Sequence, residues 1–199
     1  MFVQVIKGRT TDAAALRARG DRWQEELRPG AKGYLGGTFG TADDGTFLVI
    51  ARFADEAAAK ASSDRPEQGA WWEETAKLVD GEATFRESSD VSTLFDGGSD
   101  SAGFVQIMEG TVADRAKAEA FETPEMEAQL RAARPDLLGS IRIWFDGGSF
   151  VEAAYFTNEA AAREGEASAE FAGPQEAYIE LFGDMTFTDL RDPQVTGPA

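Results

Sequence analysis

Short apolar runs alternate with longer segments of helical spacing along the whole chain. Residues 2–6 form an apolar run typical of a strand, and Leu16, Trp23 and Leu27 then recur on one helical face. The same order continues to the C-terminus. The pattern predicts strands at 2–7, 34–40, 46–53 and about 82–87, and again at 104–109, 140–145, 149–156 and about 184–190, with helices at about 11–27 and 113–132.

Turn and cap residues complete this order of elements. Asp43-Asp44-Gly45 and Asp146-Gly147-Gly148 predict tight hairpins between the second and third strand of each half, because glycine supplies the positive φ that such turns need. A second helix is expected to begin at Asp55 and at Asn158, since both are good N-caps followed by glutamate. Each half therefore has the order βαββαβ, the ferredoxin-like motif.

The two halves also resemble each other in sequence, which predicts an internal duplication. Residues 2–8 (FVQVIKG) recur as 104–110 (FVQIMEG), and 53–60 (FADEAAAK) recur as 156–163 (FTNEAAAR). Arg28-Pro29, followed by Gly33, recurs as Arg134-Pro135, followed by Gly139, and residues 81–85 recur as 183–187. We expect a first repeat at 1–95, a Gly/Ser/Asp linker at 96–103 and a second repeat at 104–199.

The expected fold class is α+β: two ferredoxin-like βαββαβ repeats packed sheet to sheet as an intrachain pseudo-dimeric α/β barrel. Each four-stranded sheet would carry helices on one face only. The hairpins have apolar residues on both faces, so the second face must also be covered. The sister sheet is the simplest cover, and the chain would then be a monomer with an internal pseudo-dimer, with further self-association left open.

Composition narrows the function classes. The chain has no cysteine, which excludes disulfides and thiol nucleophiles and fits a cytoplasmic protein. It has no histidine, the commonest general base and a frequent metal ligand. A net charge of −17 disfavours nucleic acid and anionic membranes as partners. The apolar runs are too short to cross a membrane, and no cofactor or metal site is expected.

The repeat anchors resemble the dimeric α/β-barrel superfamily, especially its antibiotic-biosynthesis-monooxygenase branch. The resemblance covers nearly the whole chain. It rests on a Pro before a Gly ahead of the second strand, Phe53 and Phe156 at the end of the third strand, and the acidic, Ala-rich helix starts that follow. Single-unit members form homodimers, so this chain looks like a fused pair, similar to tandem proteins of high-GC bacteria.

The catalytic residues of that branch are not matched. Its quinone-forming monooxygenases use an Asn within the third strand, a Trp four residues later and a Tyr six beyond that, and its haem-degrading members need a histidine. The matching positions here are Val49, Phe53 and Ala59 in the first half and Glu152, Phe156 and Ala162 in the second. The resemblance therefore implies the fold more strongly than the activity.

Pairing the second hairpin across Gly147-Gly148 places Phe145 opposite Phe150 and Arg142 opposite Ala153. One face then carries Ile141, Ile143, Phe145, Phe150, Glu152, Ala154 and Phe156, and we assign it to the helices. The mixed face is assigned to the barrel interior, with Ser140, Arg142, Trp144, Val151, Ala153 and Tyr155. When this assignment is applied to the first half, Tyr34, Leu48, Ile50 and Arg52 fall on the interior side.

Glu152 is the candidate catalytic residue, because a lone carboxylate on an apolar strand face could serve as a general base. The alternative is a structural ion pair with a partner such as Arg142 or Arg163. Arg52, Arg142, Trp144 and Tyr155 could together bind a planar anionic ligand, or the arginines could cap strands while the aromatic rings fill the core.

Two further sets of residues are candidate ligand contacts. Arg65, Gln68, Trp71 and Trp72 follow Pro66, which must restart a helix there, and they could line a pocket mouth or simply pack. Gln4 and Gln106 occupy equivalent places in a central strand, as structural bridges or as ligand contacts. Any site is expected in one half only, because the halves have diverged.

Three functions remain open. The first is binding of a small apolar or aromatic molecule in a cavity between sheet and helices. The second is a cofactor-independent monooxygenase or isomerase acting on an aromatic polyketide-like substrate. The third is a structural or stress-related protein without a ligand.

Overall fold

The structure is a computed structural model of the chain, and it describes residues 1–95, 97–168, 178 and 180–197. The chain forms two compact units. Unit 1 comprises Met1–Ser89 and Leu190–Ala199, and unit 2 comprises Asp90–Asp189. The final residues of the chain therefore group with the first unit. Asp96 of the expected linker lies outside the described residues.

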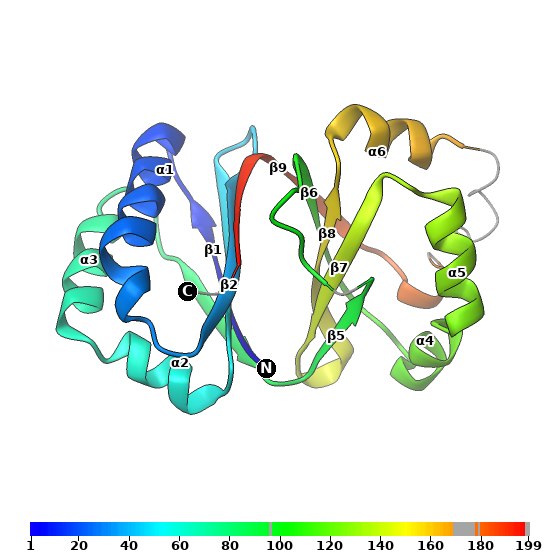
Figure 1. Cartoon of the computed structure of the whole chain (residues 1–199), viewed down its shortest axis with the longest axis horizontal. Coiled ribbons are helices and arrows are strands. Elements are labelled where there is room, and N and C mark those ends of the chain that lie inside the picture. The colour runs from blue at the N-terminus through cyan, green and yellow to red at the C-terminus, as the bar shows by residue number, and fades with distance from the viewer. Residues whose placement is uncertain (96, 169–177, 179, 198–199) are drawn as a thin grey trace. The chain divides into compact units, whose positions relative to one another are not determined.

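Unit 1 has the predicted βαββαβ order. Its strands form an antiparallel sheet in the order β4-β1-β3-β2, and the end of the last strand, from Leu190 onward, pairs with β2. Its helices lie on one face of this sheet (Figure 1). The elements are β1 (Phe2–Arg9), α1 (Ala13–Arg22), β2 (Tyr34–Thr41), β3 (Thr46–Phe53), α2 (Glu56–Ser63), α3 (Pro66–Ala76) and β4 (Thr84–Ser88).

Unit 2 repeats this arrangement, with β6, β8 and β7 side by side and β5 pairing with β7. The start of β9 lies beside β6. The elements are β5 (Val91–Leu94), β6 (Phe104–Thr111), α4 (Arg115–Phe121), α5 (Pro124–Ala133), β7 (Leu137–Trp144), β8 (Ser149–Phe156), α6 (Glu159–Glu166) and β9 (Thr186–Thr196). The α+β fold class with two ferredoxin-like units is confirmed.

Local sequence explains where the helices begin and end. Asp55 and Asn158 cap α2 and α6 as predicted, each accepting a hydrogen bond from the backbone N–H three residues on. Pro66 begins α3, also as predicted. The prediction of a single helix at 113–132 is wrong. Thr123 caps a new helix, α5, with Pro124 at its first position, because proline cannot sit inside a helix.

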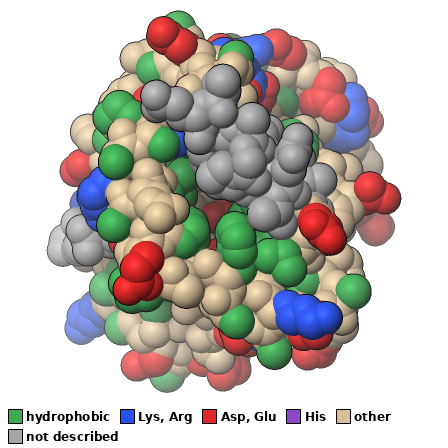
Figure 2. Space-filling model, turned by 90° about the vertical axis from the view of Figure 1, so that its right-hand side faces the viewer, with side chains coloured by type: hydrophobic (Ala, Val, Ile, Leu, Met, Phe, Trp, Pro, Cys, Tyr) green, Lys and Arg blue, Asp and Glu red, His purple; other side chains and the backbone are tan. Residues whose placement is uncertain are grey.

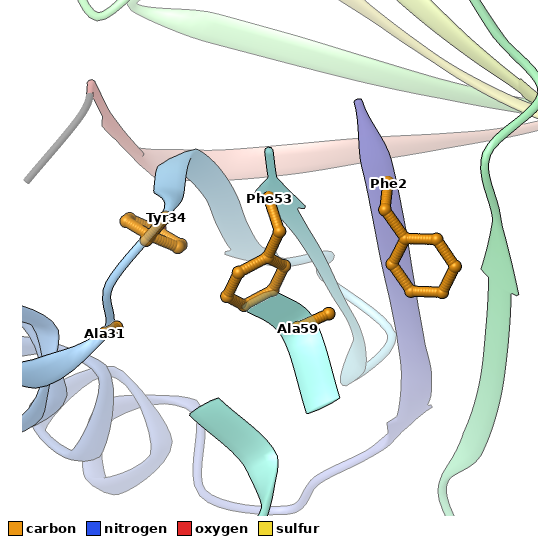
Figure 3. Close-up of a cluster of buried hydrophobic side chains, with 5 residues drawn as sticks. All are labelled: Phe2, Ala31, Tyr34, Phe53 and Ala59. Atoms are coloured by element: carbon orange, nitrogen blue, oxygen red, sulfur yellow. The ribbon is translucent and has the colours of Figure 1, made fainter. Parts of the chain in front are cut away.

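The core of each unit lies between its sheet and its helices. In unit 1, Tyr34 and Phe53 pack edge to face with ring centroids 5.6 Å apart, and Phe2, Ala31 and Ala59 complete the cluster (Figure 3). In unit 2 the corresponding core is two clusters, Val112, Ala118, Trp144, Phe150 and Phe182, and then Phe104, Ala154, Phe156 and Ala162. Among the described residues, no helix combines the length and apolar character that crossing a membrane requires.

The predicted register of the second hairpin is wrong by one residue. Arg142 lies opposite Glu152 and Trp144 opposite Phe150, because the turn holds the three residues Asp146–Gly148 and closes on Phe145 and Ser149. A one-residue slip moves a whole strand to the other face. Ser140, Arg142 and Trp144 therefore face the helices with Glu152, whereas Ile141 and Ile143 lie on the opposite face with Val151, Ala153 and Tyr155.

The assignment of Tyr34 to the interior face is also wrong. Tyr34 packs on Trp23 and Phe53 in the helix-facing core. It pairs with Phe53 as Leu137 pairs with Phe156, each just before a bulge, so Gly36 is the counterpart of Gly139. Unit 1 thus has three more residues than unit 2 between its Arg-Pro and its second strand, which the alignment of Gly33 with Gly139 concealed.

Candidate functional site

A cavity of about 700 Å³ lies in unit 2, between the helix-facing side of the sheet and helices α5 and α6. Its wall is largely apolar: Met108, Phe121, Met126, Leu130, Leu137 and Phe156 line it. Figure 2 shows the corresponding face of the molecule, where several hydrophobic side chains gather near the centre and acidic side chains are scattered around them. The cavity is of the size that small-molecule sites have in proteins.

A buried polar cluster interrupts this apolar wall. The Arg142 guanidinium donates from Nε to Glu152 Oε2 at 2.7 Å, and its Nη2 lies at the same distance from that oxygen. The Ser140 hydroxyl donates to Glu152 Oε1 at 2.6 Å. Arg142 and Glu152 are each 4% exposed. Their pairing supplies the compensation that a buried charge needs.

Tyr178 and Glu122 complete the cluster. The Tyr178 hydroxyl accepts from Arg142 Nη2 and donates to Glu152 Oε2, both at 3.0 Å. Burial and the Glu152 charge raise the pKa of Tyr178 well above its usual value, so the phenol keeps its proton. Arg142 Nη1 donates to Glu122 Oε1 at 2.5 Å. Burial raises the pKa of Glu122, against the attraction of Arg142.

Both partners of Arg142 are positioned by simple local rules. Glu152 is directly across the hairpin on the same face, where cross-strand side chains meet. Glu122 occupies the short break between α4 and α5, which the Thr123 cap and Pro124 impose. The break turns the Glu122 carboxylate towards the sheet, where it lines the cavity.

Gln106 lines the same cavity and donates to Asp189 Oδ1 at 3.0 Å. Arg163 also contacts Asp189 and pairs with Glu166 at 3.0 Å. In unit 1 the equivalent Gln4 donates to Glu87 Oε1 at 2.6 Å. Both glutamines thus bridge to an acid on the last strand of their unit, which matches the structural bridge that the sequence leaves open for them.

Unit 1 lacks the polar cluster. Phe39 lies opposite Val49 at the register position that Arg142 and Glu152 occupy in unit 2. The pocket there measures about 130 Å³. Trp23 donates to Gln68 Oε1 at 2.8 Å, and Trp71 donates to the Arg19 carbonyl at 3.2 Å, so indole rings occupy the space between sheet and helices.

The predicted site residues fall into three groups. Glu152, Arg142 and Gln106 line the unit 2 cavity, and Gln4, Gln68, Trp71 and Trp72 line the small pocket of unit 1. The others are placed elsewhere: Arg52 donates to the Thr196 carbonyl, Arg65 donates to the Leu27 carbonyl, Trp144 packs on Phe150, and Tyr155 is fully buried on the opposite sheet face.

The proposed joint site of Arg52, Arg142, Trp144 and Tyr155 does not form, because Trp144 and Tyr155 point to opposite faces of the sheet. Sequence reasoning missed Ser140 as a partner of Glu152, and also Glu122 and Tyr178. A signal for Glu122 exists in Thr123-Pro124, which predicts a helix break beside it. Within the described residues, no group of three or more acidic side chains is placed to hold a metal ion.

Comparisons with known proteins give the fold. No protein-family model matches the sequence, and no curated protein matches it. A candidate monooxygenase from Lactobacillus acidophilus superposes with a TM-score of 0.71 at 16% identity, over 98% of this chain and 96% of that chain. A candidate monooxygenase from Fusobacterium nucleatum gives 0.76 at 9% identity, over 100% and 95%.

An anthrone oxidase-like protein is also similar, with a TM-score of 0.63 at 11% identity over 98% of this chain and 91% of that one. At such low identities the likeness shows a shared fold. This chain has the architecture of these proteins along nearly its whole length.

Proposed function

We propose that unit 2 binds a small, largely apolar or aromatic molecule that carries one polar end. The observation behind this proposal is the cavity of about 700 Å³, whose wall is largely apolar and carries polar groups around Arg142 and around Gln106 and Asp189. Specific ligand sites commonly combine an apolar lining with a few fixed polar groups. The rings of the ligand would replace water along the Met, Leu and Phe side chains, and its polar end would meet the cluster.

The contrast with unit 1 supports this assignment. Apolar surface that neighbouring side chains leave uncovered gives up the burial and the packing contacts that a filled core has. Unit 1 packs the equivalent space to about 130 Å³ with Trp23 and Trp71, whereas unit 2 keeps its larger space open. A purely structural unit would gain stability from the same filling.

Binding of 1-methoxy-4-nitronaphthalene, an aromatic probe without an acidic proton, tests the proposal by titration calorimetry. We expect one molecule bound per chain. Ala133→Phe, at a position that lines the cavity, should abolish binding, whereas Ala132→Phe, exposed on the same helix, should leave it unchanged. Equal binding by both variants, or none by the wild type, would contradict the proposal and favour a protein without a ligand.

A second candidate function is cofactor-independent oxygenation of an aromatic polyketide-like substrate. Similarity to candidate monooxygenases and to an anthrone oxidase-like protein supports it at the level of fold. The cavity supplies two carboxylates beside a fixed guanidinium. One carboxylate could remove a proton from an anthrone, and the guanidinium could hold the resulting enolate. The anthrone and one O₂ would then give the quinone and one water.

Oxygen uptake with 1,8-dihydroxyanthrone tests this second function. Turnover that disappears in Glu152→Gln would support the sequence-based assignment of Glu152 as the base. Turnover that survives Glu152→Gln but disappears in Glu122→Gln would assign the role to Glu122, which is the less enclosed of the two carboxylates. Uptake that is identical with and without the protein would exclude the oxygenase function.

A further inference from the structure

Arg142 holds two carboxylates with a single positive charge. Its Nε and Nη2 bind Glu152, and its Nη1 binds Glu122. When both carboxylates are ionised, the cluster of Glu122, Arg142 and Glu152 carries one excess negative charge at a largely buried place in the cavity wall. Protonation of one carboxylate would remove that excess charge, and movement of one carboxylate away from the other would reduce the repulsion between them.

The two carboxylates are not equally fixed. Glu152 lies in mid-strand, its side chain is 5% exposed, and its oxygens accept from Ser140, Arg142 and Tyr178. Glu122 lies between two helices and its side chain is 29% exposed. Glu122 can therefore turn away without breaking the pairing of Arg142 with Glu152, and it would leave Arg142 Nη1 facing the cavity.

The surroundings of Glu122 favour its protonated form. Burial raises its pKa, and the carboxylates of Glu152 on β8 and Glu119 on α4 raise it further, while Arg142 on β7 opposes them. Tyr178, the remaining member of the cluster, stays a neutral phenol. Glu122 is thus the group of the cluster best placed to take up a proton: it is the more exposed carboxylate, and its pKa is raised.

We propose that the ligand of this cavity carries an acidic hydroxyl, a phenol or an enol, on an apolar ring system, and that Arg142 holds its oxygen as an anion while Glu122 takes its proton. This inference rests on the proposed binding function. The O–H bond of the ligand breaks, its electron pair stays on the oxygen next to Arg142 Nη1, and the proton forms an O–H bond on Glu122. The net charge of cluster and ligand together does not change.

The matched ligands 4-nitro-1-naphthol and 1-methoxy-4-nitronaphthalene separate this inference from the binding function. They share a ring system and differ in the acidic proton, and the naphtholate absorbs at longer wavelength than the naphthol. We expect wild-type protein to bind the naphthol about 10- to 100-fold more tightly than the ether, as a charge-assisted hydrogen bond would give. The bound naphthol should show the naphtholate spectrum below the pH at which it ionises in water.

Glu122→Gln keeps the size of the side chain and a hydrogen-bond acceptor for Arg142 but cannot take up the proton. It should still bind the ether and lose the naphtholate spectrum. Glu125→Gln, an exposed position on α5, removes the same charge and should behave as the wild type. Ether binding that is retained also shows that the Glu122→Gln cavity has folded.

Three results overturn the inference. If naphthol and ether bind the wild type equally, binding stands and recognition of an acidic hydroxyl fails. If Glu122→Gln retains the naphtholate spectrum, Glu122 is not the proton acceptor. If neither ligand binds, the binding function itself fails.

Discussion

Arg142 and Glu152 face each other across the hairpin of β7 and β8, with Arg142 Nε 2.7 Å from Glu152 Oε2 and both side chains almost fully buried. A buried ion pair is no general source of stability, because removing two charges from water costs about as much as their attraction returns. Its value here is positional: the pair fixes a guanidinium at the wall of the cavity, with Nη1 directed to Glu122.

Breaking this pair should destabilise the protein strongly, whereas replacing both partners should not. Arg142→Met leaves Glu152 buried without a counter-ion and should lower the free energy of unfolding by about 3–5 kcal/mol. Arg142→Met combined with Glu152→Leu should recover much of that loss. Urea unfolding of the two single variants and the double variant measures the coupling. A double variant that loses the full sum of the single effects would contradict a direct pairing.

The pH dependence of stability should reveal the protonation of Glu122. Because burial raises its pKa in the folded state, the stability that Glu122 contributes is fully present below its unfolded pKa and is lost as the pH rises through the folded pKa. Between about pH 4 and pH 8, the free energy of unfolding of the wild type should therefore fall relative to that of Glu122→Gln as the pH rises. Glu125→Gln should follow the wild type; a constant difference for Glu122→Gln would contradict the shift.

Of the two glycines in the turn that sets the register, one should be sensitive to substitution and its neighbour should tolerate it. A side chain at Gly148 would come within 2.6 Å of the Val112 carbonyl oxygen, whereas one at Gly147 meets open space; both residues have positive φ. Asparagine tolerates positive φ, so Gly147→Asn should cost under about 1 kcal/mol. Gly148→Asn should cost roughly 1–3 kcal/mol more, as thermal unfolding would show. Equal costs would argue against this turn.

The contribution of aromatic packing to the stability of unit 1 should be measurable by substituting the adjacent residues Trp71 and Trp72. Trp71 is half-buried, lines the small pocket and donates to the Arg19 carbonyl, so Trp71→Ala should cost about 3 kcal/mol, the low end for a core tryptophan. Trp72 lines the same pocket, but its ring forms a T-shaped pair with Phe85, which is 56% exposed, so Trp72→Ala should cost less. Chemical unfolding of the two variants gives the comparison, and the reverse order would show that Trp72 carries the packing.

The sequence predicted the fold well because strand alternation, helix caps and turn glycines are local signals. Asp55, Asn158 and Pro66 begin helices as expected. The site was harder, because it depends on register. Periodicity does not reveal whether a turn after Phe145 has two residues or three, and that single residue decides whether Arg142 meets Glu152.

The remaining partners come from different parts of the chain. Tyr178 lies 26 positions beyond Glu152, and the distance along the sequence carries no sign of the hydrogen bond between them. Glu122 was hidden inside a helix predicted to be continuous, although the Thr123-Pro124 break exposes it. Long-range pairing of polar residues is therefore the part of the site that the pattern could not supply.

A crystal structure of the protein with 4-nitro-1-naphthol tests whether the unit 2 cavity binds an acidic hydroxyl at Arg142. We expect one naphthol in the unit 2 cavity, with its rings against Met126, Leu130 and Phe156 and its oxygen within hydrogen-bond distance of Arg142 Nη1. A cavity that stays without ligand at saturating concentration, or a naphthol bound with its oxygen away from Arg142, would contradict it.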